Sequence, residues 1–162
     1  MIRFLIPAIS AFALSGCALV ADTADVRIDR EAPPLETYRV DGLPDWAPFS
    51  SVARAGDILF VSGHLGRRPG SEDLVPGGAG PQTTQTMANI EASLGLVGAT
   101  LDDLASCTIY LADMADYPAM NEAYAAALGD HRPARATAGV AALALGAAVE
   151  IECVAYAPLN PN

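Results

Sequence analysis

Arg135 and Glu150 are the two residues of this sequence whose side chains could most directly perform chemistry together. The chain contains no lysine, so arginine is the only permanent cation that it can offer to an anion. A guanidinium is a planar fork of donors that binds a carboxylate through two parallel hydrogen bonds. A neighbouring glutamate can orient or deprotonate a water molecule once that anion is bound. The pair therefore predicts hydrolysis of a small substrate that carries a carboxylate.

The elements that must position this pair are the last two predicted strands, 134–140 and 149–157, and we expect the arginine to face the carboxylate on the next strand. A helix is predicted over 82–97, where apolar residues repeat at three- and four-residue spacing, and Asp116 and Gly129 suit the two ends of a second helix. The other predicted strands span 35–40, 49–53, 58–62 and 104–111, with a glycine- and proline-rich loop over 63–81. Two helices and about six strands favour a two-layer α+β fold with a mixed sheet and both helices on one face.

The start of the chain predicts a lipoprotein signal peptide over residues 1–16. A short basic start precedes an apolar run that is too short to span a bilayer. The run ends in Leu-Ser-Gly-Cys, which resembles the bacterial lipobox and implies that Cys17 is acylated. Because Ala18 follows the cysteine, the motif implies the periplasmic face of the outer membrane, where two acyl chains give a stable anchor. An ordinary secretory signal or a buried apolar start is the alternative.

Composition divides the remaining chain into a tether, one domain and a tail. Segment 17–34 is polar and ends in two prolines, which predicts a flexible tether, whereas 35–158 is long enough for one core. Residues 159–162 form the tail. The formal net charge is −10, and loss of the signal peptide removes an arginine but no acidic residue. This charge excludes nucleic acid and anionic lipid surfaces as partners, because both require clustered cations.

The cysteines and histidines give little support for a metal site. Cys107 and Cys153 lie in two strand-like runs, where they either form a disulfide or stay as buried thiols. His64 and His131 are far apart in the sequence, and no Cys-x-x-Cys motif occurs. We therefore do not expect a metal site.

Six short motifs occur in an order typical of one protein family. They are Pro48-Phe49-Ser50, Phe60-Val61-Ser62-Gly63-His64, Asn89-Ile90, Asn121-Glu122-Ala123-Tyr124, Pro133-Ala134-Arg135 and Glu150-Ile151-Glu152. Together they resemble the Rid family (YjgF type, RidA-like) of enamine and imine deaminases. The resemblance implies a chorismate-mutase-like fold and a homotrimer whose sheets form a central barrel. It also implies three clefts between subunits and no cofactor.

The resemblance assigns roles to individual residues of this chain. Arg135 matches the family's arginine that binds the substrate carboxylate, and Glu150 matches the acid that positions the hydrolytic water. Ser62 and Gly63 match the loop that lines the cleft from the adjoining subunit. Asn121 matches an asparagine of the second helix with an architectural role.

Three further positions match substrate-binding positions of the family but carry a different residue. Phe49 stands where the family often has tyrosine, His64 where glutamine is usual, and Thr137 where cysteine is frequent. These changes bear on the substrate range, since they alter hydrogen-bonding groups around the expected cleft.

The resemblance implies hydrolytic deamination of 2-imino or enamine acids to 2-keto acids and ammonium, in the cell envelope. The expected partners are a small 2-imino or 2-keto acid, two further copies of the chain, and the membrane through Cys17. Two alternatives stay open. One is a trimeric module that binds small carboxylates without turnover. The other is a hydrolase of another small amide on the same scaffold.

Overall fold

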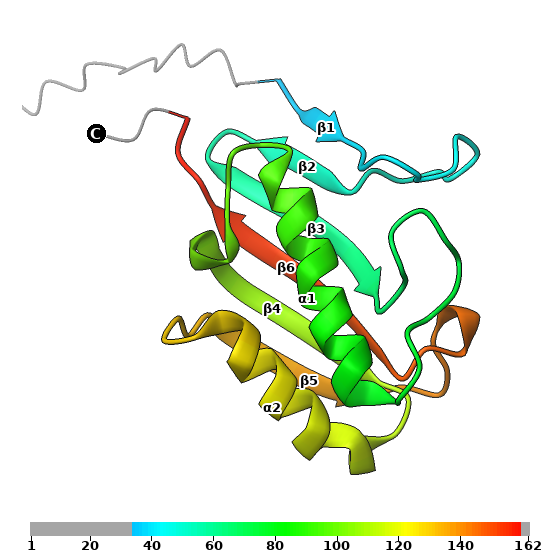
Figure 1. Ribbon diagram of the computed structural model, residues 1–162. Helices are drawn as coiled ribbons and strands as arrows, with labels where there is room; N and C mark the ends of the chain where they lie inside the picture. Colours follow the sequence, from blue (N-terminus) through cyan, green and yellow to red (C-terminus); the bar gives the residue numbers. More distant parts are fainter. Residues whose placement is uncertain (1–33, 160–162) are drawn as a thin grey trace, which may run out of the picture. The chain divides into compact units, whose positions relative to one another are not determined.

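The computed structural model describes residues 34–159, which form a sheet with two helices against it (Figure 1). The helices are α1 (Ala79–Gly95) and α2 (Tyr117–Leu128). The strands are β1 (Glu36–Tyr38), β2 (Val52–Ala55), β3 (Ile58–Leu65), β4 (Leu104–Leu111), β5 (Ala134–Gly139) and β6 (Val149–Tyr156). The predicted signal peptide, Cys17 and almost all of the tether lie outside the described residues, as does the end of the tail.

The strands pair in the order β1-β2-β3-β6-β4-β5. All neighbours are antiparallel except β4 and β5, which are parallel, so the sheet is mixed. The prediction of a six-stranded mixed sheet with two helices on one face is thus confirmed. The last strand, β6, lies at the centre of the sheet, and β5 lies at one edge.

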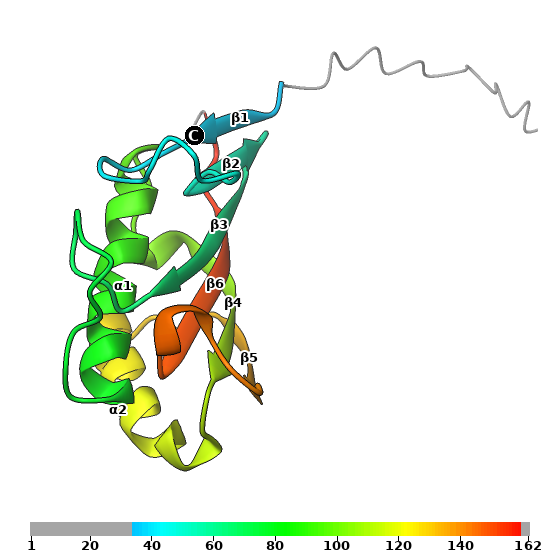
Figure 2. The same cartoon turned by 90° about the vertical axis from the view of Figure 1, so that its right-hand side faces the viewer.

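The sheet and the helices form two layers in the view of Figure 2, and the buried core residues belong to both layers. Alternate residues of β6 point toward the helices and are buried, as strand geometry requires. They meet apolar side chains from both helices, and burial of each large aliphatic group contributes about 1.5–3 kcal/mol. The contacting residues include Val149, Ile151 and Ala155 of β6, Met87, Ile90 and Leu94 of α1, and Met120 and Leu128 of α2.

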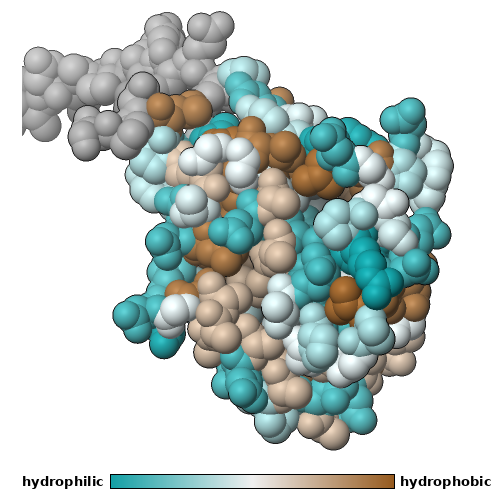
Figure 3. Space-filling view, viewed as in Figure 1, coloured by the Kyte–Doolittle hydropathy of each residue, from teal (hydrophilic) through white to brown (hydrophobic). Residues whose placement is uncertain are grey.

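The two sides of the sheet differ. On the helix side, a band of mildly apolar side chains runs down the surface between polar ones, with a few strongly apolar patches (Figure 3). On the other side, no element of the described residues covers the strands (Figure 2). Phe60 and Tyr156 project there and are 51% and 54% exposed. Below, this uncovered side is called the open face.

A disulfide joins two central strands. Cys107 of β4 and Cys153 of β6 are opposite one another in the antiparallel register, with an S–S distance of 2.04 Å. Both side chains are buried, at 1% and 4% exposure. Of the two states that the sequence left open, the structure thus contains the bonded one.

The predicted boundaries differ from the structure at several elements. The strand predicted over 49–53 overlaps β2 only at residues 52–53, and α1 begins three residues before the predicted 82. The loop predicted over 63–81 begins too early, because β3 continues through a bulge to Leu65. Asp116 does precede α2, but its side chain makes no capping hydrogen bond, whereas Asp113 accepts one from the amide of Ala115. No helix among residues 34–159 has the length and apolar character needed to cross a membrane.

Candidate functional site

Arg135 lies on the edge strand β5 with its guanidinium on the helix side. Its Nη2 donates a hydrogen bond of 2.9 Å to the hydroxyl of Tyr117. The guanidinium carbon lies 5.8 Å from the ring centroid of Tyr117 and 5.1 Å from that of Tyr124. These aromatic contacts hold the cation by attraction to the ring faces. Arg135 remains exposed, so its other donors can bind an anion.

A cavity of about 390 Å³ opens between α2 and the start of β5, and Arg135 forms part of its wall. Asn121 and Tyr124 of α2 line the same cavity. Thr137 lies two residues beyond Arg135 on the same side of β5, opposite Ile109 of β4. Its hydroxyl is buried and has no hydrogen-bond partner. The structure therefore keeps Thr137 and Asn121 in the Arg135 region.

Glu150 lies on the open face of β6, against the bulge of β3. A Cβ atom placed on Gly63 would lie 2.2 Å from the Oε1 of Glu150, so a larger residue there would displace the carboxylate. Burial raises the pKa of the Glu150 carboxyl above its usual 4.5, and the charge of Glu152 raises this pKa further. A carboxyl with a raised pKa is suited to exchange protons with a reacting group.

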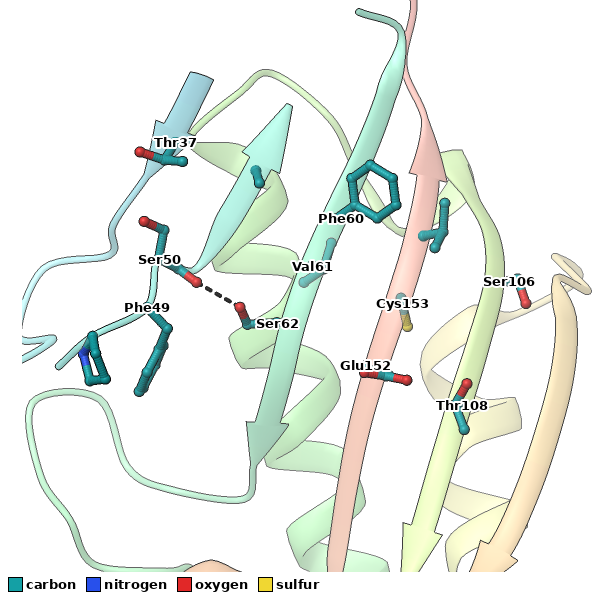
Figure 4. Close-up of a pocket in the computed structure, with 13 residues that line it drawn as sticks. Thr37, Phe49, Ser50, Phe60, Val61, Ser62, Ser106, Thr108, Glu152 and Cys153 are labelled. Atoms are coloured by element: carbon teal, nitrogen blue, oxygen red, sulfur yellow. Dashed lines mark hydrogen bonds between the residues drawn. The ribbon is translucent and has the colours of Figure 1, made fainter. Parts of the chain in front are cut away.

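A second cavity, of about 530 Å³, extends over the open face beside Glu150 (Figure 4). Phe49 and Ser62 line it together with Glu152, which lies two residues from Glu150 on the same side of β6. Glu152 Oε1 accepts a hydrogen bond of 3.0 Å from the hydroxyl of Tyr110, and this bond raises the pKa of the tyrosine. The predicted residues Phe49, Ser62, Gly63 and Glu150 thus belong to one region.

Hydrogen bonds to backbone carbonyls hold Ser62 and Phe49, two of the residues that line this cavity. The hydroxyl of Ser62 donates to the carbonyl of Ser50 at 2.6 Å, as the dashed line in Figure 4 marks. The guanidinium of Arg39 donates to the carbonyl of Phe49 at 2.6 Å and to that of Ala47 at 3.1 Å. Phe49 itself is half exposed, which leaves its ring as an apolar wall.

The His64 side chain does not point to the open face of its own chain, and its contact with substrate stays a prediction. The bulge turns its side chain toward α1, where Nε2 lies 2.8 Å from the hydroxyl of Ser93. Nδ1 lies 2.6 Å from the carbonyl oxygen of Ser62. The imidazole therefore connects the bulge to the helix.

The expectation that Arg135 faces Glu150 is wrong within one protomer. Strand β4 separates β5 from β6, because the last strand inserts into the middle of the sheet. Arg135 is level with Cys107, which is level with Cys153. Glu150 lies three residues before Cys153 and so points to the opposite face, at roughly 14 Å between Cα atoms by sheet geometry. Each chain therefore carries the two groups in separate regions.

Sequence reasoning missed the tyrosines that hold the arginine. Tyr117 and Tyr124 are seven residues apart, which places both on one face of α2. That spacing was readable from the sequence, but the position of β5 next to this helix face was not. Among the described residues, no cluster of His, Cys, Asp and Glu could hold a metal ion.

Comparisons with known proteins agree with this architecture. The family profile described as "Endoribonuclease L-PSP" matches residues 42–157. A RutC family protein of Pyrococcus horikoshii is 38% identical over 109 residues, which are 67% of this chain and 86% of the relative. The mouse 2-iminobutanoate/2-iminopropanoate deaminase is 36% identical over 108 residues, which are 67% of this chain and 80% of the enzyme.

A solved structure of RidA from a Psychrobacter species superposes with a TM-score of 0.69 at 34% identity. The superposition covers 75% of this chain and 98% of that one. The profile match and the relatives together show that the chain belongs to the Rid (YjgF/L-PSP) family.

Proposed function

We propose that this protein hydrolyses reactive 2-imino acids and their enamine tautomers to 2-keto acids and ammonium. The observation that carries the proposal is the state of Arg135. Its guanidinium is exposed and is held by two tyrosine rings rather than by a carboxylate among the described residues. Such a cation is prepared to bind a carboxylate in two parallel hydrogen bonds. The mouse relative, whose name states action on 2-iminobutanoate and 2-iminopropanoate, supports the substrate class.

The two halves of the site come together between copies of the chain in this proposal. Arg135 lies on the helix side at the sheet edge, whereas Glu150 and Gly63 lie on the open face. Packing of the edge of one protomer against the open face of the next brings the arginine to the carboxylate. A closed ring of three such contacts is a homotrimer. Burial of Phe60 and Tyr156 in this interface accounts for the exposure of both aromatic rings in the single chain.

The chemistry needs only orientation and proton transfer. Arg135 binds the substrate carboxylate and draws electron density from the adjacent imine carbon. Glu150 of the neighbouring copy orients a water molecule toward that carbon and accepts its proton. The C–O bond forms and the proton taken up by Glu150 passes to nitrogen, which gives a carbinolamine. The carbinolamine hydroxyl then passes its proton through Glu150 to the nitrogen, the C=O double bond forms, and the C–N bond breaks to leave the 2-keto acid and ammonia, which takes a proton from water to give ammonium. Orientation of this kind contributes several kcal/mol, and no cofactor enters the proposed steps.

The proposal places the enzyme in the cell envelope, anchored through Cys17 at the periplasmic face of the outer membrane. The disulfide between Cys107 and Cys153 supports this location, because such bonds persist in oxidising compartments. The substrates would then be imino acids released by amino-acid oxidation at the membrane. Substitution of Cys17 by serine should release the protein from the membrane fraction. If the variant sediments with membranes as the wild type does, the anchor is wrong.

Turnover tests the function directly. Protein lacking residues 1–17 is added to imino acids that an amino-acid oxidase generates in the presence of catalase, and release of ammonia is followed. We expect acceleration with at least one small aliphatic amino acid as the source, and none with Arg135→Ala. Absence of acceleration across a panel of amino acids rejects the deaminase. Binding of a 2-keto acid that requires Arg135, without any turnover, identifies the binding module instead. Parallel assays with small amides detect the other hydrolase.

A further inference from the structure

The bulge in β3 sets the position of Glu150. The pairing of β3 with β6 shifts register between Val61 and His64, and Gly63 lies at the shift. Its backbone is so close to the Glu150 carboxylate that a Cβ atom would overlap Oε1. A movement of the bulge therefore moves the carboxylate or opens a gap beside it.

One imidazole ties this bulge to the helix layer. The carbonyl oxygen of Ser62 can only accept, so the Nδ1 atom of His64, 2.6 Å away, carries a proton. On the other side of the ring, Nε2 lies 2.8 Å from the hydroxyl of Ser93. Ser93 is fully buried on α1. The ring thus spans from the backbone beside Gly63 to a fixed point in the core.

The hydroxyl of Ser93 has two acceptors within reach and one proton to donate. When His64 is neutral, its Nε2 carries a lone pair and accepts a hydrogen bond from the Ser93 hydroxyl. When His64 is charged, Nε2 donates to Ser93, whose hydroxyl then turns to the carbonyl of Asn89, 3.0 Å away. The hydrogen bond between His64 and Ser93 therefore reverses direction when the ring is protonated, whereas the bond from Nδ1 to the Ser62 carbonyl keeps its direction.

We propose that His64 is a positioning residue that holds the Ser62–Gly63 bulge against Glu150 in its neutral form, and that protonation loosens this arrangement because the buried charge has no anionic partner among the described residues. The inference rests on the proposed function for its effect on catalysis. Its structural part, the coupling of the His64 charge to the bulge, does not.

The surroundings of His64 disfavour the charged ring. Burial lowers the pKa of His64 below its usual 6.5, and the hydrogen bond to the Ser62 carbonyl opposes this only in part. On β6 the nearest acid, Glu150, points to the other face of the sheet, and on α1 the acid Glu91 is exposed. After β3, Arg67 adds a cation. The one ionisable residue of β2 is Arg54, which is a buried cation. Within residues 34–159, a charge on the ring would therefore lack an anionic partner.

The sign of the pH effect follows from this lowered pKa. The unfolded chain binds a proton at His64 more readily than the folded chain does, so stability and bulge order are complete above about pH 6.5. Both decline as pH falls from that value through the lower pKa of the folded state. Glu150 also ionises on the acid side. The test must therefore separate the ionisation of His64 from that of Glu150.

The experiment compares the full-length wild type with His64→Gln and His64→Ala. A glutamine amide can donate to the Ser62 carbonyl without titrating, whereas alanine leaves that acceptor unpaired. The chain has only two histidines, so the two imidazole resonances are assigned by loss of one in His64→Gln. In the wild type, the titration of the assigned His64 signal is followed together with the backbone amide signal of Gly63 from about pH 5 to pH 8. Values of kcat and KM are measured over the same range.

We expect the Gly63 amide to shift with the same midpoint as His64, below 6.5, and to lose this shift in His64→Gln. The acid limb of kcat should become shallower in His64→Gln, with activity at neutral pH retained. His64→Ala should lower kcat by roughly tenfold to a hundredfold with little change in KM, as expected for misplacement of a reacting group. A Gly63 amide that does not follow His64, or an acid limb unchanged in His64→Gln, overturns the proposal. If the wild type shows no turnover, the proposed function fails and the Gly63 titration alone decides the coupling.

Discussion

The Arg135 region and the Glu150 region lie on opposite faces of one sheet and are built in different ways. Arg135 is exposed at an edge strand and is held by the hydroxyl and rings of two tyrosines. Glu150 is pressed against the backbone of Gly63 in the sheet centre, and burial raises its pKa. One region presents a permanent cation, and the other presents a carboxyl whose pKa is raised.

This difference has a chemical consequence. An arginine beside a carboxyl lowers the pKa of that carboxyl, often by one to three pKa units. Glu150 would then remain a weak base at every working pH. The two groups are separated within one protomer, so Arg135 does not lower the pKa of Glu150 in the single chain. In the proposed trimer the arginine of the next copy lies near Glu150, and the bound substrate carboxylate would then balance the charge of that arginine.

Loss of Arg135 should have the largest effect. Arg135→Ala removes two charge-assisted hydrogen bonds, each of about 1.5–3 kcal/mol, and should lower kcat/KM about 10²- to 10⁴-fold. Arg135→Lys keeps the charge but loses the fork, so it should recover only part of the activity. Steady-state ammonia release measures both. Full activity of the alanine variant would remove the basis for a carboxylate site at β5.

Glu150→Gln should have the next largest effect, because it keeps the shape of the side chain but cannot accept a proton. We expect kcat to fall about a hundredfold with KM nearly unchanged, since Arg135 still binds the substrate. In the wild type, kcat should decline as pH falls toward the pKa of Glu150, which lies above 4.5. The variant should lack this decline. A pH profile that is the same in both proteins would assign proton transfer to another group.

A mixture of the two inactive proteins tests whether one site takes its halves from two protomers. In co-expressed Arg135→Ala and Glu150→Gln chains, about one interface in four combines an intact arginine with an intact glutamate if the assembly is a ring. Activity should therefore return to about a quarter of wild type, a rise of tens of fold over either variant. The doubly substituted chain mixed with wild type serves as the control. No recovery in mixed assemblies would place both groups in one protomer's site.

Local sequence patterns predicted the strands and helices of this fold well, but they did not predict which strands pair in the sheet. The helix between Asp116 and Gly129 and the strand 104–111 were placed correctly, because caps and apolar spacing are local signals. The place of β6 between β3 and β4 depends on long-range pairing, which no local pattern reports. That one fact decides that Arg135 and Glu150 do not meet in one chain.

The same limit applies to the residues around the candidate site. Gly63 was predicted to line the cleft, but its close contact with Glu150 depends on a bulge. Sequence reasoning ended β3 before this bulge. His64 changed sides for the same reason, since one inserted residue reverses the face to which the next side chains point. A bulge that the sequence does not reveal therefore changes which side chains are expected to face the proposed substrate site.

Tyr117→Phe should have the smallest effect and is the most specific probe of the Arg135 region. The substitution keeps the ring 5.8 Å from the guanidinium but removes the hydroxyl that accepts from Nη2. A net hydrogen bond of about 0.5–1.5 kcal/mol corresponds to a rise in KM of about twofold to tenfold. We expect kcat to change little, because the lost contact orients the binding group and not the reacting water. Tyr38→Phe is the matched control, since it removes a tyrosine hydroxyl bonded to Glu36 at the opposite edge of the sheet. An equal rise in KM in both variants would mean that loss of a tyrosine hydroxyl acts through general stability, and a fall in kcat in Tyr117→Phe alone would link Arg135 to the chemical step itself.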